Sequence, residues 1–116
     1  MDRGKVDVIQ PDVGRAGGLT ECMRIAKLAD QRGLLCTPHG WKSGLTVAAE
    51  IHFSAASPNV PFVEFMVPEL WPSIIRSQLI QPEFTPEDGI IKLPKTPGLG
   101  VELNEEVVQH LQWPST

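Results

Sequence analysis

Three residues whose side chains can hold or transfer a proton, Asp12, His39 and Glu64, lie about 25 residues apart in the sequence. This spacing is the length of one strand-and-helix unit. His39 directly follows an apolar run and is the candidate base. If the strands before Asp12 and His39 are neighbours, the carboxylate can accept the Nδ1–H of the imidazole, which fixes its tautomer and makes Nε2 a better base. Asp12 alone would be read as a turn residue.

The other two candidate site residues are Glu64 and Trp41. Glu64 lies between apolar residues, where a carboxyl group that stays protonated can donate a hydrogen bond to a substrate carboxylate. The alternative is a solvated position at the edge of a sheet. Trp41 follows His39 closely and is expected to cover the site and contact the substrate.

Apolar patterning predicts the elements that must position these side chains. Three apolar runs are expected as strands: Val6–Gln10, Leu34–Thr37 and Pro61–Met66. Between them we expect a helix that begins at Thr20 as N-cap and closes at Gly33, and a helix over Leu45–Ala56. Buried strands that alternate with amphipathic helices predict a parallel sheet covered on its faces, with the chemistry at the carboxyl ends of its strands.

The pattern changes after Met66. We expect a short helix around Ser73–Arg76, a hairpin that pairs Leu79–Ile80 with Ile90–Leu93, and a last short helix capped by Asn104. This tail of the chain has little core of its own and is expected to pack on something else.

Composition excludes several classes of function. The chain has 116 residues, a net charge of −4 and no basic stripe, so we expect no nucleic-acid partner. It has no apolar run of roughly 18 residues and no signal-peptide core, so we expect no membrane partner and a cytoplasmic location. Cys22 and Cys36 lie in apolar surroundings and are expected as buried free thiols rather than a disulfide or zinc ligands.

Four motifs together resemble the C-terminal part of an enolase-superfamily enzyme, most closely the mandelate racemase subgroup with its many acid-sugar dehydratases. They are Ile9–Thr20 (IQPDVGRAGGLT), Pro38–Trp41 (PHGW), Val63–Glu64 and Pro97–Val101 (PGLGV). The resemblance implies an α/β fold, with residues 1–78 corresponding to strands six to eight of a modified (β/α) barrel. Residues 79–116 correspond to the segment that returns to the capping domain.

The resemblance also implies roles. His39 would remove the proton α to a carboxylate, Asp12 would be its dyad partner, and Glu64 would hydrogen-bond the enediolate, with Mg²⁺ as Lewis acid. The family's metal ligands belong to strands that this sequence does not contain, so we expect no metal bound by this chain alone and little or no activity. The expected small-molecule partner is an acid sugar, and we expect a homo-oligomer or association with the remaining barrel. Alternatives are a racemase, an epimerase or a cycloisomerase of the same superfamily, or a truncated, non-catalytic interaction module.

Overall fold

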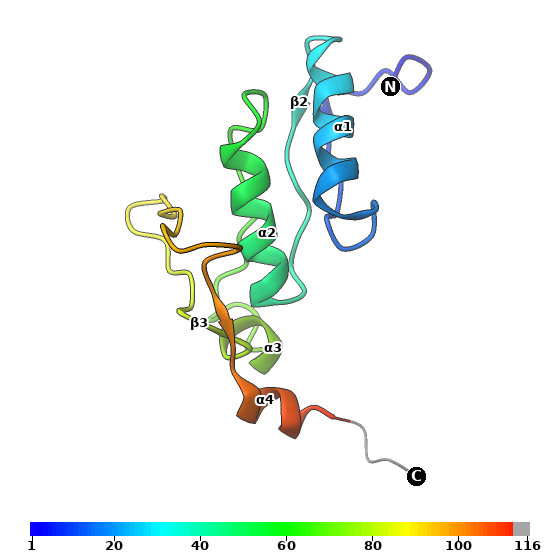
Figure 1. Cartoon of the computed structure of the whole chain (residues 1–116). Coiled ribbons are helices and arrows are strands. Elements are labelled where there is room, and N and C mark those ends of the chain that lie inside the picture. Colours follow the sequence, from blue (N-terminus) through cyan, green and yellow to red (C-terminus); the bar gives the residue numbers. More distant parts are fainter. Residues whose placement is uncertain (113–116) are drawn as a thin grey trace.

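The computed structural model describes residues 1–112, so the last four residues of the C-terminal segment predicted at 79–116 lie outside the described part. Helices and short strands alternate through the first half, and the second half is mostly irregular (Figure 1). In chain order the elements are β1 (Val8–Ile9), α1 (Gly18–Asp30), β2 (Leu35–Cys36), α2 (Gly44–Ala55), α3 (Ile74–Ser77), β3 (Ile80–Gln81), β4 (Glu102–Leu103) and α4 (Glu105–His110).

Strands β1 and β2 pair in parallel, with Val8 opposite Leu35 and Ile9 opposite Cys36, and α1 makes the crossover between them. The pairing continues past the strand ends, because the main-chain N–H of His39 donates to the carbonyl of Pro11 at 3.0 Å. The residues that follow the two strands therefore lie side by side, which brings residue 12 next to residue 39.

Helix α1 begins earlier than predicted. Its N-cap is Gly17, with a φ of 105°, and Thr20 lies inside the helix, so the prediction of Thr20 as cap was wrong. Gly17 takes a left-handed conformation that other residues rarely adopt, and no side chain caps the helix. The buried face of α1 is formed by small residues, Cys22, Ala26 and Ala29.

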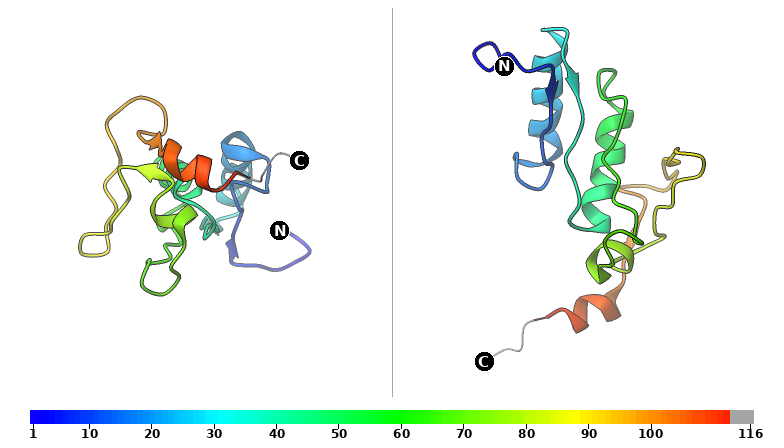
Figure 2. Two further views of the ribbon diagram at one scale, coloured as in Figure 1. Left: turned by 90° about the horizontal axis from the view of Figure 1, so that it is seen from below. Right: turned by 180° about the vertical axis from the view of Figure 1, so that it is seen from behind.

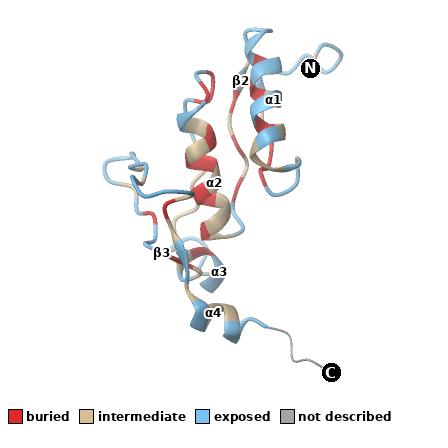
Figure 3. Ribbon diagram, viewed as in Figure 1, coloured by how far each residue is buried: buried red, intermediate tan, exposed pale blue. Residues whose placement is uncertain are grey.

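Helix α2 is the central element of the described chain and is buried on more than one side (Figure 3). Ser43 caps it, since its Oγ accepts the N–H of Thr46 at 3.2 Å. One face packs with α1 and β2 in a core that contains Cys22, Cys36 and Phe53. The other face packs against β3 and the irregular C-terminal segment, through residues such as Val47, Ile51, Ile80 and Phe84. Both cysteines are buried and free, as predicted.

Two predicted pairings were wrong. Within residues 1–112, the segment Pro61–Met66 is extended but pairs with no neighbouring strand. The predicted hairpin is also replaced, because Ile80 pairs antiparallel with Leu103 of β4. Residues 87 and 90 form only an isolated bridge. The last short helix was predicted correctly, and the Asn104 side chain accepts the N–H of Val107 at 3.4 Å.

The described chain is less compact than an ordinary domain of its length. Its radius of gyration is 15.5 Å, against about 13 Å expected for a chain of this size. The N-terminal loop and α4 lie at opposite ends of the described chain (Figure 2). Large apolar side chains are therefore left in solvent, among them Phe62, Leu70, Trp71 and Ile90.

The architecture is α/β, with successive strand-and-helix units that form part of a barrel rather than a closed one. The predicted fold class is therefore confirmed. In residues 1–112, no helix has both the length and the apolar character needed to cross a membrane.

Candidate active site

Asp12 and His39 lie at the carboxyl ends of β1 and β2, and the parallel pairing of these strands brings their side chains together. Nδ1 of His39 lies 3.3 Å from Oδ2 of Asp12. The Asp12 side chain is only 9% exposed, whereas the imidazole is 41% exposed. The geometry is that of an oriented base: the buried carboxylate faces one ring nitrogen and leaves Nε2 directed away from it.

The Asp12 carboxylate is held by several further donors. Its Oδ1 accepts the main-chain N–H of Gly14 at 2.9 Å, and its Oδ2 accepts Nζ of Lys42 at 2.8 Å. Burial, the largest influence, raises the pKa of Asp12, but the hydrogen bonds from Lys42, His39 and Gly14 outweigh it and hold that pKa below its usual 3.8. Asp12 is therefore an anion at neutral pH. Lys42 shares the oxygen that faces His39, and no sequence pattern predicts this contact.

Glu64 faces the other nitrogen of the imidazole. Its Oε2 lies 3.9 Å from Nε2 of His39, and the side chain is 29% exposed. This Oε2 atom is buried and has no hydrogen-bond partner within residues 1–112. Its neighbours Val63 and Phe65 pack instead against the α2 cluster that contains Val47 and Ile51. The structure thus brings Asp12, His39 and Glu64 together in that order.

Trp41 lies at the edge of this group. Its ring centroid is 5.7 Å from that of His39, and the two ring planes are tilted by 33°. The indole is partly exposed, so a ligand that approaches the imidazole from solvent meets it as well.

Sequence reasoning missed Glu50, a fully buried carboxyl group on α2. Burial raises its pKa to about 8, and the negative charges of Asp12 and Glu64 act in the same direction, opposed by Arg76 and Lys42. Neither carboxyl oxygen has a hydrogen-bond partner within the described chain. The available signal was a glutamate placed among Ala, Val and Ile on a helix that has apolar residues on more than one face.

Arg76 of α3 was also missed. It is fully buried, with its guanidinium carbon 4.4 Å from the centre of the Phe65 ring and Nη1 3.8 Å from Oε1 of Glu83. Burial lowers its pKa, while Glu83 and Glu50 act in the opposite direction. Arg76 thus places a buried positive charge behind the extended segment that carries Glu64.

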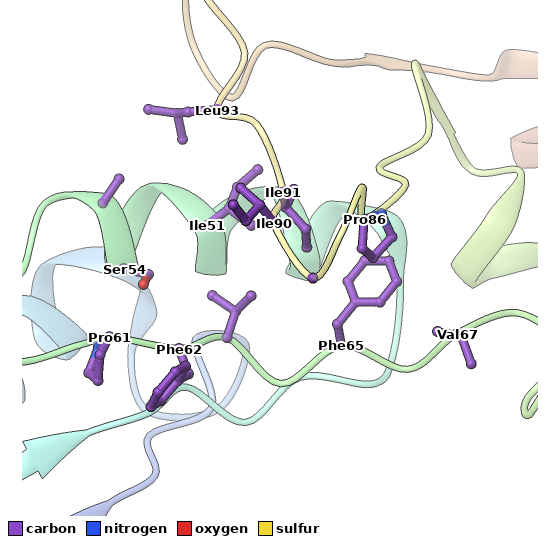
Figure 4. Close-up of a pocket in the computed structure, with 13 residues that line it drawn as sticks. Ile51, Ser54, Pro61, Phe62, Phe65, Val67, Pro86, Ile90, Ile91 and Leu93 are labelled. Carbon is purple, nitrogen blue, oxygen red and sulfur yellow. The ribbon is translucent and has the colours of Figure 1, made fainter.

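A separate apolar cavity of about 480 Å³ lies between α2, the extended segment after Pro61 and the loop that reaches Leu93 (Figure 4). Val63 and Phe65 line it, while Glu64 does not. Apart from Ser54, the lining side chains are apolar. The cavity therefore lies on the opposite side of this segment from His39 and holds none of the candidate site residues.

The described residues do not fit a Mg²⁺ site. Within residues 1–112, no three His, Cys, Asp or Glu side chains are grouped so as to hold a metal ion. Asp12 already accepts hydrogen bonds from Lys42 and Gly14 and faces His39. Hard cations such as Mg²⁺ require several oxygen ligands in near-octahedral geometry. The expectation that this chain alone binds no Mg²⁺ stays a prediction.

Comparison with known proteins extends these observations. The chain is 39% identical over 112 residues to an L-rhamnonate dehydratase of Saccharopolyspora erythraea, a match that covers 92% of this chain and 27% of the relative. It is 30% identical over 122 residues to a D-galactarolactone cycloisomerase of Agrobacterium fabrum, covering 98% of this chain and 32% of that protein. The chain thus spans about a third or less of the length of these relatives.

Comparison with solved structures gives relatives of the same kind. A mandelate racemase/muconate lactonizing enzyme from Sulfitobacter sp. superposes with a TM-score of 0.82 at 31% identity, covering 94% of this chain and 26% of that one. A second mandelate racemase/muconate lactonizing enzyme, from Jannaschia sp. CCS1, superposes with a TM-score of 0.79 at 29% identity. The match covers 96% of this chain and 28% of that one. The enolase C-terminal domain-like family model matches residues 1–107. The chain therefore belongs to the enolase C-terminal domain-like family and is related to the mandelate racemase/muconate lactonizing enzymes.

Proposed function

We propose that this chain is the proton-transferring segment of an acid-sugar dehydratase, a lyase in which His39 removes the proton α to a substrate carboxylate. One observation carries the proposal: the His39 imidazole lies between two carboxyl groups, with Nδ1 at 3.3 Å from Asp12 and Nε2 at 3.9 Å from Glu64. A base at this point has one nitrogen oriented and the other beside a group that can bind a carboxylate.

In the proposed reaction, Nε2 of His39 takes the α-proton and the electron pair of the C–H bond moves into the carboxylate to give an enediolate. The carboxyl group of Glu64 hydrogen-bonds to an oxygen of that enediolate as negative charge develops. The imidazolium then returns its proton to the β-hydroxyl group, which leaves as water while the C–C double bond forms. Atoms and charge balance without an oxidant or reductant.

Asp12 has the supporting role in this proposal. Its buried carboxylate stabilises the imidazolium that forms when His39 accepts the proton. Lys42 shares the same oxygen, at 2.8 Å, and so offsets part of the negative charge that Asp12 offers to His39. Trp41 is proposed to contact the substrate, because its ring lies beside the imidazole.

The substrate class is proposed from the relatives, which are named for L-rhamnonate and for D-galactarolactone. The cycloisomerase among them supports a second candidate, an isomerase that uses the same first step and ends differently. Since the chain spans about a third or less of these proteins, we propose that it works together with the remaining barrel strands and that by itself it has little or no activity. The non-catalytic interaction module remains the alternative that this proposal must exclude.

The proposal is tested by grafting. Residues 1–112 replace the homologous segment of the S. erythraea L-rhamnonate dehydratase, and dehydration of L-rhamnonate with Mg²⁺ is compared for the chimera and for the isolated chain. We expect turnover by the chimera and none by the isolated chain. His39→Asn in the chimera is expected to lower kcat by at least about a hundredfold, whereas His110→Asn, an exposed histidine on α4, leaves it unchanged. An equally active His39→Asn chimera contradicts the proposal.

A further inference from the structure

Glu50 is a buried carboxyl group that the proposed reaction does not use. It lies in the middle of α2 with no exposed surface, and neither oxygen has a hydrogen-bond partner within residues 1–112. Such a group lowers the stability of the fold, because a buried polar atom loses its hydrogen bonds to water and gains no protein hydrogen bond in exchange. Leu, Ala or Met at this position would bring no such penalty, so the carboxyl group requires a reason.

The Glu50 side chain reaches the loop that carries His39. Its carboxyl group occupies the space beside the α-carbon of Gly40, so that any β-carbon at position 40 would overlap both of its oxygens. Gly40 does not have a positive φ, so its backbone conformation is open to other residues. Glycine is required here by the close approach of Glu50 rather than by the turn.

Apart from the Lys42 side chain, which donates to Asp12 at 2.8 Å, the loop has few other supports at this point. His39 N–H donates to Pro11 at 3.0 Å on one side, and Ser43 begins α2 on the other. Between them, the N–H groups of residues 40–42 make no main-chain hydrogen bond within the described chain. Packing of Glu50 against Gly40 is thus a contact that can fix the middle of the loop.

We propose that Glu50 is a positioning residue for His39: its carboxyl group, seated against Gly40, sets the path of the main chain that presents the imidazole to Asp12 and Glu64. The inference rests on the proposed role of His39 as base, because a misplacement of about 1 Å at a catalytic group can cost about a hundredfold in rate. Glu50 acts through the loop and touches no reacting atom.

Besides burial, which has the largest effect, charged groups on several elements influence the pKa of Glu50: Asp12 after β1 and Glu64 raise it, whereas Arg76 on α3 and Lys42 in the His39 loop lower it. Glu50 in turn raises the pKa of the Cys22 thiol on α1. Burial and the two acids together keep the carboxyl group neutral at pH 7, since its pKa is about 8. The neutral form therefore lies against Gly40, which makes glutamine the conservative replacement.

A size exchange tests the proposal. Glu50→Ala leaves a hole beside residue 40, Gly40→Ala adds a methyl group that collides with Glu50, and the double variant places that methyl group in the hole. The readout is the pair of imidazole nitrogen and carbon-bound proton signals of His39 in a long-range ¹H–¹⁵N spectrum of the chain, assigned with His39→Asn. We expect both single variants to move these signals, the double variant to return them toward the wild-type positions, and Glu50→Gln to leave them in place.

Two controls keep the result interpretable. Ser54→Ala removes a hydrogen bond to Val60 at the far end of α2, so it lowers stability without touching the loop and is expected to leave the His39 signals unchanged. If Glu50→Ala does not fold, the comparison of Gly40→Ala with the double variant and the Glu50→Gln spectrum still decides the question. Unchanged His39 signals in Gly40→Ala, or a double variant no closer to wild type than Gly40→Ala, would overturn the proposal.

Failure of this inference is distinguishable from failure of the proposed function. The spectra report the position of His39 and do not depend on turnover, whereas the grafted chimera reports turnover and does not depend on Glu50. If the chimera is inactive but the double variant restores the His39 signals, Glu50 supports the loop and the role of His39 as base is refuted. If the chimera is active and depends on His39 but the double variant does not restore the signals, only the positioning role of Glu50 is refuted.

Discussion

Oδ2 of Asp12 lies 3.3 Å from Nδ1 of His39, although 27 residues separate the two in sequence. The relationship is a direct result of parallel pairing, because β1 and β2 run in the same direction and end at the same edge. Two loops, each a few residues long, then place an acid and an imidazole face to face. Any pair of residues at these two positions would meet, so it is their chemistry that distinguishes this site.

Replacing Lys42 tests how the dyad is tuned. Lys42→Met removes the hydrogen bond to Oδ2 and a positive charge, so the pKa of Asp12 is expected to rise toward 3.8 or above it, since burial then acts against fewer donors. The measurement is the carboxyl carbon signal of Asp12 followed against pH by NMR. Lys92→Met, which removes an exposed partner of Glu87, is the matched control. An Asp12 titration that is identical in both variants would contradict the tuning.

Replacing Asp12 tests the stability linked to that low pKa. A carboxyl group whose pKa is lower in the folded state stabilises the fold above its unfolded value, 3.8, and loses this contribution as the pH falls through its folded-state pKa. Asp12→Asn is therefore expected to lower the free energy of unfolding by on the order of 1 kcal/mol at pH 7. The difference from wild type should shrink below about pH 4. Urea unfolding at a series of pH values measures it, and a difference that stays constant down to pH 3 argues against the linkage.

Glu50 is expected to change the free energy of unfolding with pH in the opposite direction from Asp12. Its pKa is raised from 4.5 to about 8, so between these values the folded state binds the proton more strongly and the free energy of unfolding falls as the pH rises. Glu50→Gln removes this dependence, so the variant gains on wild type by up to a few kcal/mol as the pH increases from 5 to 9. Thermal unfolding across this range tests it. The exposed Glu87→Gln serves as control, and parallel curves for wild type and Glu50→Gln would show that the buried carboxyl group does not titrate in this window.

The assignment of Ser43 as the N-cap of α2, directly after the His39 loop, can also be tested. Ser43→Ala removes the acceptor for the N–H of Thr46 and is expected to cost about 1 kcal/mol of stability. Thr20→Ala is the informative comparison: Thr20 lies in an exposed position inside α1, where Gly17 is the cap, so its loss changes stability little. Equal losses in the two variants would contradict the assignment of the caps.

The strand-and-helix order of the first half could be predicted from sequence, because the patterns that specify it are local. Alternating apolar runs and a Gly-terminated amphipathic helix indicate β1, α1, β2 and α2 within a few residues of their observed ends. Pro61–Met66 was the informative failure. It has the composition of a buried strand, but a strand also needs a partner, and none pairs with it in residues 1–112.

Long-range details of the site could not be predicted. The approach of Asp12 to His39 was conditional on strand order, which the crossover helix made plausible. That Lys42 turns back to the same carboxylate depends on the conformation of the loop, and no sequence pattern specifies it. Arg76 has the charge of a surface residue, and only the packing of α3 within the fold shows that it is buried. For Glu50 the apolar neighbours on α2 are a signal of burial, but they do not indicate that its carboxyl group lies against Gly40.

Exchange of the α-proton tests the central claim most directly, because it isolates the first step from the chemistry that follows. The grafted chimera is incubated with L-rhamnonate and Mg²⁺ in D₂O. Mass spectrometry measures deuterium at the α-carbon of recovered substrate and the amount of dehydration product, whose formation requires loss of the same α-proton. The account predicts that the chimera forms product, that His39→Asn lowers α-proton removal by at least about a hundredfold, and that His110→Asn has no effect. Undiminished removal of the α-proton in the His39→Asn chimera would contradict it.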